Sequence, residues 1–284
     1  MDVVYTQRGD AFAQLWQHIP LLKLTYFEFE NRYDPDVVLF WMRDHWEVPI
    51  LAVLAYVVLI VAGPKLMDKL GVGRLELRAA MATWNALLSV FSFIGMLRTA
   101  PHLLHNVANK DYMTTVCTPP HLDWGSGATG LWVQLFILSK IPELIDTLWL
   151  VLKRRDVIFL HWYHHITVLL YCWHAYTNEA GAGLYFVAMN YSVHAIMYGY
   201  YCLMTLRVVP KWFPAWWITI AQIAQMFIGT GVCISCWYFM LTGAKCHNAL
   251  ENLIAGGLMY GSYLYLFVEF AVKRFVLNQK VKGE

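Results

Sequence analysis

Long apolar segments recur along the chain, and each has the length that a membrane-spanning helix needs. Such a helix takes about 20 mainly apolar residues. From the N- to the C-terminus the segments lie at 46–63, 80–104, 130–152, 157–176, 183–204, 213–241 and 252–272. The pattern therefore predicts an all-α, polytopic membrane protein with seven transmembrane helices. Residues 1–45 form an N-terminal segment, 46–272 the membrane core and 273–284 a tail.

Basic residues are distributed unevenly between the predicted loops, and this predicts an orientation. Alternate loops and the tail hold most of them: Lys65, Lys69, Arg74, Arg78, Lys153, Arg154, Arg155, Arg207, Lys211, Lys273, Arg274, Lys280 and Lys282. The intervening loops hold Lys110 and Lys245. Because positive charge marks cytosolic loops, we expect a luminal N-terminus and a cytosolic C-terminus. Lys280 and Lys282 then form a KxKxx retrieval signal of the endoplasmic reticulum membrane.

The composition agrees with a lipid environment. Hydrophobic residues make up 59% of the 284 residues and charged residues 14%, against about 45–50% and about 25% in soluble domains. The net charge of +2 gives no support to a nucleic-acid partner.

Two of the six cysteines fall in different loops that are predicted to face the lumen. These are Cys117 and Cys246. Because the lumen is oxidising, we expect a disulfide between them. The other four lie within predicted spans and are expected to pack as small apolar residues: Cys172, Cys202, Cys233 and Cys236.

The third predicted span carries charged residues, which are costly in lipid at about 2.5–3.5 kcal/mol each on insertion scales. At about 100° per residue, Lys140, Glu143 and Thr147 share a narrow stripe, and Asp146 borders it. These residues need an aqueous or protein-lined interior. Two interpretations stay open and do not exclude each other. The charges form an ion-pair cluster that fixes helix packing, or they orient catalytic groups nearby.

The next three spans continue the polar lining. His161, His164 and His165 are spaced so that they share one face of the fourth span. One stripe of the fifth span and one of the sixth hold Asn190, His194, Met197, Tyr198, Tyr201, Thr219, Gln222 and Gln225. Glutamine and threonine in membranes often only join helices. Together the four spans predict an enclosed polar chamber toward the cytosolic side, with an apolar remainder toward the lumen.

These four patterns resemble the signature motifs of the ELO family of very-long-chain fatty acid elongases. The motifs are Lys140-x-x-Glu143-x-x-Asp146-Thr147, His161-x-x-His164-His165, Asn190-x-x-x-His194-x-x-Met197-Tyr198-x-Tyr200-Tyr201 and Thr219-x-x-Gln222-x-x-Gln225. They occur in the family's order. The resemblance implies one membrane domain over 1–284, with a helical barrel or bundle that encloses a narrow acyl tunnel.

The resemblance also implies an activity. It is the condensation of long-chain acyl-CoA with malonyl-CoA to give 3-oxoacyl-CoA, CO2 and CoA, the first and rate-setting step of microsomal elongation. The implied enzyme is an acyltransferase with no cofactor. Its partners would be the two CoA substrates, the bilayer and the ketoacyl-CoA reductase, dehydratase and enoyl reductase of the cycle. A homodimer is left open.

A finer resemblance concerns the substrate. The stretch 157–171, which lacks the glutamine usual in the polyunsaturated branch, is similar to the branch acting on saturated and monounsaturated chains. The stretch Phe27-Glu28-Phe29-Glu30 is also similar to that branch. By this analogy we expect a substrate of about 16 carbons.

For this chemistry we expect His164 to accept the acyl group as an acyl-imidazole. His194 and Asn190 would stabilise the enolate left by decarboxylation. The charged group of the third span would position the imidazoles, His161 and His165 included. In the alternative, His164 or His165 acts only as a general base.

The remaining motif and loop residues are expected to bind substrate. They are Tyr198, Tyr201, Gln222, Gln225, Arg154 and Arg155. The two arginines would meet the CoA phosphates, although they serve equally well as topology determinants. Bulky residues near the luminal side would stop the acyl chain, and the candidates are Tyr171, Trp173, His174, Trp237 and Tyr238.

Two other classes of protein share some of these sequence features. A membrane di-iron desaturase or hydroxylase also has an H-x-x-H-H box, but it needs about eight histidine ligands. The further pair here is His102 and His105 at the luminal end of the second span, so a metal site is not expected. A non-enzymatic transporter or receptor would suit seven spans, but the inverted repeats and broken helices typical of transporters are not evident.

Overall fold

The structure, a computed structural model, describes residues 4–9, 11–12, 14–210 and 212–277. Within them the chain is all-α apart from one antiparallel pair of two-residue strands. The N-terminal elements are β1 Val4–Tyr5, β2 Ala11–Phe12, α1 Leu15–His18, η1 Pro20–Leu24, α2 Glu28–Asn31 and α3 Asp36–Asp44. The later elements are α4 Glu47–Lys69, α5 Arg78–Asn109, α6 Tyr112–Cys117, η2 Pro120–Leu122, α7 Gly127–Ser139, η3 Pro142–Leu144, α8 Ile145–Leu152, α9 Phe159–Thr177, α10 Gly183–Leu206, α11 Trp216–Leu241, α12 Leu250–Ala271 and η4 Val272–Leu277.

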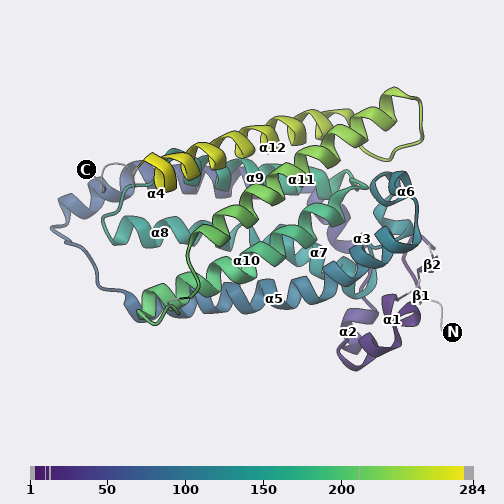
Figure 1. Ribbon diagram of the computed structural model, residues 1–284, viewed down its shortest axis with the longest axis horizontal. Helices are drawn as coiled ribbons and strands as arrows, with labels where there is room; N and C mark the ends of the chain where they lie inside the picture. The colour runs from purple at the N-terminus through teal and green to yellow at the C-terminus, as the bar shows by residue number, and fades with distance from the viewer. Residues whose placement is uncertain (1–3, 10, 13, 211, 278–284) are drawn as a thin grey trace.

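The long helices run roughly side by side along the longest axis of the molecule (Figure 1). Among the described residues, four helices are long and apolar enough to cross a membrane: α4, α5, α11, and α12 together with the turn that follows it. The helices α9 and α10 have the length, with 19 and 24 residues, but they carry the polar motif residues that lower their hydropathy. The prediction of an all-α membrane protein is confirmed. Four of the described helices meet the length and hydropathy of a membrane span, so the predicted count of seven is not confirmed.

The third predicted span is not one continuous helix, which corrects the sequence interpretation. Its residues form α7, the 3₁₀ turn η3 and α8. The break coincides with Pro142, because proline lacks the N–H of a helical bond and clashes with the carbonyl four residues earlier. Lys140 and Thr147 therefore lie on different helical segments, and their directions are set by the break rather than by one regular stripe.

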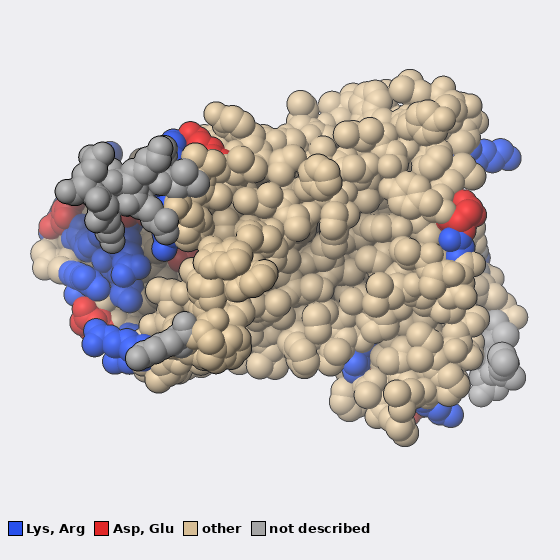
Figure 2. Space-filling view, viewed as in Figure 1, with Lys and Arg blue, Asp and Glu red and all other residues tan. Residues whose placement is uncertain are grey.

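The two ends of the bundle differ in charge. Lys and Arg side chains gather at the end where α4 and α8 finish, and the broad middle of the visible face is almost free of charge (Figure 2). Such a band suits contact with lipid tails. The predicted retrieval lysines Lys280 and Lys282, and Lys211 in a loop, lie outside the described residues.

The opposite end is closed by the N-terminal segment and two loops (Figure 1). Buried Glu30 forms an ion pair with Arg98 of α5, with Nε and Oε1 2.9 Å apart. A disulfide joins Cys117 at the end of α6 to Cys246 before α12, as the sequence predicts. These links hold the N-terminal segment and the loop after α11 against the bundle.

Candidate functional site

The three histidines of α9 lie against one another. The rings of His161 and His165 have their centroids 4.6 Å apart, and those of His164 and His165 are 5.6 Å apart. This places all three on one side of the helix, as their spacing predicts. The ring of Tyr263 in α12 lies tilted against that of His164, with centroids 5.2 Å apart, and the Tyr263 hydroxyl donates to the backbone carbonyl of His164. The histidine cluster is therefore covered by aromatic packing.

A buried ion pair lies at the end of α7. The ammonium of Lys140 donates to both oxygens of Glu143 at 2.7 and 2.9 Å, and the hydroxyl of Ser139 donates to Glu143 at 2.8 Å. Both charged side chains are almost completely buried. Removing one partner of such a pair leaves the other charge buried and uncompensated, at a cost of about 3–5 kcal/mol. This pair supports the first of the two interpretations, a structural cluster.

Asp146 makes its hydrogen bonds to other helices and not to that pair. Trp84 of α5 donates its indole N–H to Oδ1 at 2.6 Å, and Tyr198 of α10 donates its hydroxyl to Oδ2 at 2.7 Å. The carboxylate thus joins α8 to two other helices. Trp84 was not among the predicted residues, because a tryptophan in an apolar span gives no sign of its partner.

Thr147 contacts the histidine cluster directly. Its hydroxyl lies 2.8 Å from Nε2 of His161 and 2.8 Å from the hydroxyl of Tyr56 in α4. Tyr56 was also missed. The sequence does give one sign of its role. Tyr56 carries a phenolic hydroxyl in the most apolar span, and a polar group that is buried there needs a hydrogen-bond partner.

The residues of α10 offer unpaired polar groups beside these imidazoles. Asn190 is buried, and its side-chain oxygen has no hydrogen-bond partner. Within the described part of the chain, the ring nitrogens of His164 and His194 also have no hydrogen-bond partner. The two imidazoles are close enough to interact electrostatically, and Lys140 lies within the same range of His194. Buried polar groups are usually satisfied, so the unpaired amide oxygen of Asn190 is suited to a ligand.

The other predicted binding residues divide into two groups. Tyr198 is buried beside His194, with ring centroids 5.3 Å apart, and Gln225 is buried on α11. Gln222 donates to the sulfur of Met197 at 3.4 Å, which fits a role in joining helices. Tyr201 is 42% exposed, so it lies at the surface of the bundle.

The basic end does not use its arginines equally. Arg154, at a left-handed φ of 55°, donates to Asp68 at 2.7 Å and to the carbonyls of Pro64 and Val72. Its guanidinium is thereby committed to the end of α4, which weakens its assignment to substrate. Arg155 is exposed, and Lys153 beside it has a pKa lowered by burial and then by the charges of Arg155 and Arg74. Arg155 remains the better candidate for an anionic group.

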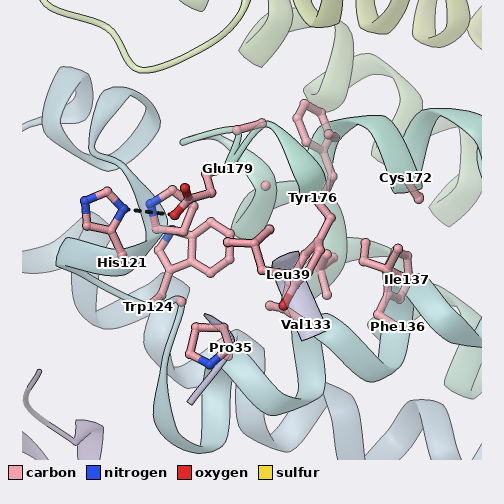
Figure 3. A pocket seen from close by; sticks show the side chains of 18 of the residues that line it. Pro35, Leu39, His121, Trp124, Val133, Phe136, Ile137, Cys172, Tyr176 and Glu179 are labelled. Atoms are coloured by element: carbon pink, nitrogen blue, oxygen red, sulfur yellow. Dashed lines mark hydrogen bonds and ion pairs between the residues drawn. The ribbon is translucent and has the colours of Figure 1, made fainter. Parts of the chain in front are cut away.

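An apolar cavity lies farther along the same helices, toward the end closed by the N-terminal segment (Figure 3). The cavity and the open solvent at its mouth together occupy about 670 Å³. Much of its lining is apolar: Leu39, Val133, Phe136, Ile137, Tyr171, Cys172, Phe186 and Val187. Phe136 also contacts Lys140, whose ammonium lies 4.0 Å from its ring centroid. The cavity and the buried ion pair are therefore neighbours.

The residues predicted to stop the acyl chain lie in different surroundings. Tyr171 lines the cavity. Trp173 is buried but donates to the backbone of Met42, and His174 pairs with Asn252. Trp237 packs in another cluster, and Tyr238 is 62% exposed. An exposed side chain cannot end an internal cavity, so Tyr238 is a wrong candidate.

An ionic network covers the mouth of the cavity. Glu179, between α9 and α10, accepts two hydrogen bonds from Arg8 at 3.1 and 3.0 Å, one from Arg43 at 3.0 Å and one with His121 at 2.9 Å (Figure 3 shows the last). Burial alone would raise the pKa of the Glu179 carboxyl, but the hydrogen bonds from Arg8 and His121 outweigh it and lower the pKa to about 2. The carboxylate stays ionised and holds the N-terminal segment over the cavity.

Clustered histidines can also bind a metal ion. Among residues 4–9, 11–12, 14–210 and 212–277, no group of three or more His, Cys, Asp or Glu side chains could hold a metal ion.

The fold and the site together define an α-helical membrane protein that holds a histidine cluster and, farther along the same helices, an apolar cavity. Residues 41–283 match the model of the ELO (GNS1/SUR4) family. The chain belongs to this family.

Several relatives support that membership. The chain is 36% identical to very long chain fatty acid elongase 6 of Homo sapiens over 273 residues, which cover 94% of this chain and 100% of that protein. It is 37% identical to the elongase 6 of Gallus gallus, covering 91% of this chain and 96% of that protein. It is 38% identical to fatty acid elongase 1 of Trypanosoma cruzi, covering 88% of this chain and 93% of that protein. Elongases from distant organisms thus match nearly the whole chain.

Proposed function

We propose that this protein is a fatty acid elongase that condenses acyl-CoA with malonyl-CoA, giving 3-oxoacyl-CoA, CO2 and CoA. The observation that carries the proposal is that α9 holds the histidine cluster near its start and lines an apolar cavity farther along. The reacting carbons of the substrate need the imidazoles, and the fatty chain needs the apolar cavity. Family membership and the relatives' names support the same activity.

The condensation divides into two steps. His164 attacks the thioester carbonyl of acyl-CoA, the carbon–sulfur bond breaks, and CoA leaves as its thiolate. Malonyl-CoA then loses CO2, and the resulting enolate carbon attacks the acyl-imidazole carbonyl and releases His164. An N–H of the Asn190 amide and a ring N–H of His194 donate to the enolate oxygen and stabilise it. In the variant with His164 or His165 as a general base, no acyl-enzyme forms, and trapping an acylated α9 peptide by mass spectrometry separates the two.

The substrate orientation follows from the charge at the two ends. Both CoA substrates are polyanions, so they enter at the basic end, where Arg155 is exposed. The acyl chain extends past Phe136 into the apolar cavity. We propose saturated or monounsaturated chains of about 16 carbons, because residues 157–171 are similar to the branch of the family that acts on such chains.

The topology is proposed on the same grounds. Seven spans, counting α7 with α8, α9 and α10 beside the four apolar helices, put the basic end in the cytosol. The disulfide then faces the oxidising lumen of the endoplasmic reticulum. The KxKxx tail would return the protein there, and the remaining enzymes of the cycle would receive its product.

The test is release of labelled CO2 from malonyl-CoA by the purified protein in lipid vesicles. We expect release that depends on added acyl-CoA and a product two carbons longer. Expression in yeast lacking its own elongases gives the product range. Acyl-CoA-dependent release equal to that of empty vesicles would contradict the proposal.

A further inference from the structure

Helix α4 lies at the edge of the bundle, yet it directs one polar side chain inward. Among its 23 residues the buried ones are Pro49, Tyr56 and Met67. Its outward residues are apolar and exposed, as lipid contact requires: Ile50, Leu51, Leu54, Val58 and Val61. Tyr56 is 2% exposed and faces α8 and α9, against which α4 packs. A phenylalanine would fill the same space without a polar group to bury.

The Tyr56 hydroxyl begins a short chain of hydrogen bonds. It lies 2.8 Å from Oγ1 of Thr147, and that oxygen lies 2.8 Å from Nε2 of His161. Thr147 is completely buried. The Tyr56 ring also contacts His165, with centroids 5.9 Å apart. One residue of an outer helix therefore contacts one histidine of the cluster and reaches another through a threonine.

Counting donors gives the direction of these hydrogen bonds. Within the described residues, Thr147 is the one partner of the Tyr56 hydroxyl. If Nε2 of His161 donated to Thr147, three donors would share the two contacts, and either the phenolic proton or the threonine proton would have no acceptor. An unpaired buried donor costs about 1–3 kcal/mol. The arrangement that gives both hydroxyl protons an acceptor has Tyr56 donating to Thr147 and Thr147 donating to Nε2.

We infer that Tyr56 and Thr147 are positioning residues that hold neutral His161 with its proton on Nδ1 and its ring fixed against His165. This inference rests on the proposed function for its effect on turnover, whereas the tautomer itself does not depend on that function. The ring of His165 is 4.6 Å from that of His161 and 5.6 Å from that of His164. Holding the first ring thereby limits the positions of the other two.

The structure provides a matched control. Tyr185 and Thr115 form another buried tyrosine–threonine pair, with the same 2.8 Å between hydroxyls, and Thr115 continues to the backbone carbonyl of Tyr112 rather than to a histidine. Both Tyr56→Phe and Tyr185→Phe remove one buried hydroxyl bond, so their effects on stability should be similar. Only Tyr56→Phe disturbs a histidine.

We expect Tyr56→Phe to lower kcat for condensation by about two- to ten-fold, the range of one lost hydrogen bond. KM for both substrates stays unchanged, because neither hydroxyl touches them. Thr147→Val lowers kcat at least as far, and Thr147→Ser, which keeps the hydroxyl, retains wild-type kcat. Tyr185→Phe keeps kcat as well. In the Thr147→Val background, Tyr56→Phe has no further effect, because the chain is already broken.

Histidine ¹⁵N spectra of the protein in micelles test the tautomer without any activity. The signal that disappears in His161→Gln should show a proton on Nδ1 in the wild type and a mixture of tautomers in Tyr56→Phe. A proton on Nε2 in the wild type overturns the inference, as does an equal loss of kcat in Tyr56→Phe and Tyr185→Phe. A wild-type protein that releases no CO2 refutes the proposed function instead, and the spectra still decide the tautomer.

Discussion

The ammonium of Lys140 lies 4.0 Å from the ring centroid of Phe136. Lys140 belongs to a buried ion pair with Glu143, whereas Phe136 is part of the cavity wall. The polar and the apolar parts of the interior therefore meet within one turn of α7. A fatty acyl thioester has the same division, with a polar reacting end and a long apolar chain, and it would cross this contact.

His164→Ala and His194→Ala are each expected to lower condensation by at least about 100-fold, the usual contribution of a positioned acid, base or nucleophile. The ring nitrogens of His164 and His194 have no hydrogen-bond partner in the described structure, so the substitutions should affect folding little. Thermal unfolding in detergent would verify this. His105→Ala is the control, because His105 stacks on His18 at the opposite end. Either variant keeping more than a tenth of wild-type CO2 release would remove that residue from the mechanism.

Cys117→Ser is expected to lower the free energy of unfolding by about 2–4 kcal/mol, because the disulfide closes a long loop in the unfolded chain. The two cysteines are 129 residues apart. Thermal unfolding measures the loss of stability. Added reductant should lower the stability of the wild type to that of Cys117→Ser. Cys202→Ser, at a free cysteine, should change little. Peptide mapping that finds both thiols free in protein from the membrane would exclude the bridge.

Tyr171→Ala is expected to lengthen the longest product by about two carbons or more, because a smaller side chain extends the apolar cavity that accepts the chain. The first condensation should keep its rate. Product profiles in yeast without elongases provide the measurement. Tyr238→Ala removes an equally large but exposed side chain and should leave the profile unchanged. An unaltered longest product in Tyr171→Ala would show that this wall does not limit the chain.

Glu179→Gln tests the ionic network at the cavity mouth. The pKa of Glu179 is lowered from 4.5 to about 2, so its stabilisation is complete above about pH 4.5 and is lost as the pH falls toward 2. The shift corresponds to at most about 3 kcal/mol, and solvent screening at partly exposed Arg8 reduces this to about 1–2 kcal/mol.

The measurement is the unfolding temperature at pH 7 and at pH 3. The wild type should lose more stability than Glu179→Gln over this interval, because the variant has no carboxylate to protonate. Glu28→Gln removes an exposed pair with Arg32 and should behave like the wild type. Parallel losses in the wild type and Glu179→Gln would show that the network does not stabilise the fold.

Much of this protein follows from local sequence. The bounds of α4, α9, α10 and α12 lie within a few residues of the predicted apolar segments, except that α4 continues to Lys69. The reason is that a helix satisfies its own backbone hydrogen bonds, so length and apolar content suffice to place it. The spacing of His161, His164 and His165 likewise fixes their common face, because the helical period is local.

Other features depend on which helices meet. The break at Pro142 turns Asp146 toward Trp84 and Tyr198 instead of Glu143, and this direction depends on the packing of α5 and α10 against α8. Similarly, Arg154 is committed to Asp68 because its loop folds back onto the end of α4.

The sequence by itself determined the membrane class, the helical segments, the pairing of Cys117 with Cys246 and the residues of the four motifs. Only the tertiary structure joined Tyr56 to His161 through Thr147, and Arg8 to Glu179, 171 positions later in the chain. Periodicity and composition predict which residues form each helix and which of its faces are apolar. A contact between residues far apart in sequence depends on the relative position and rotation of whole helices, which no local pattern contains.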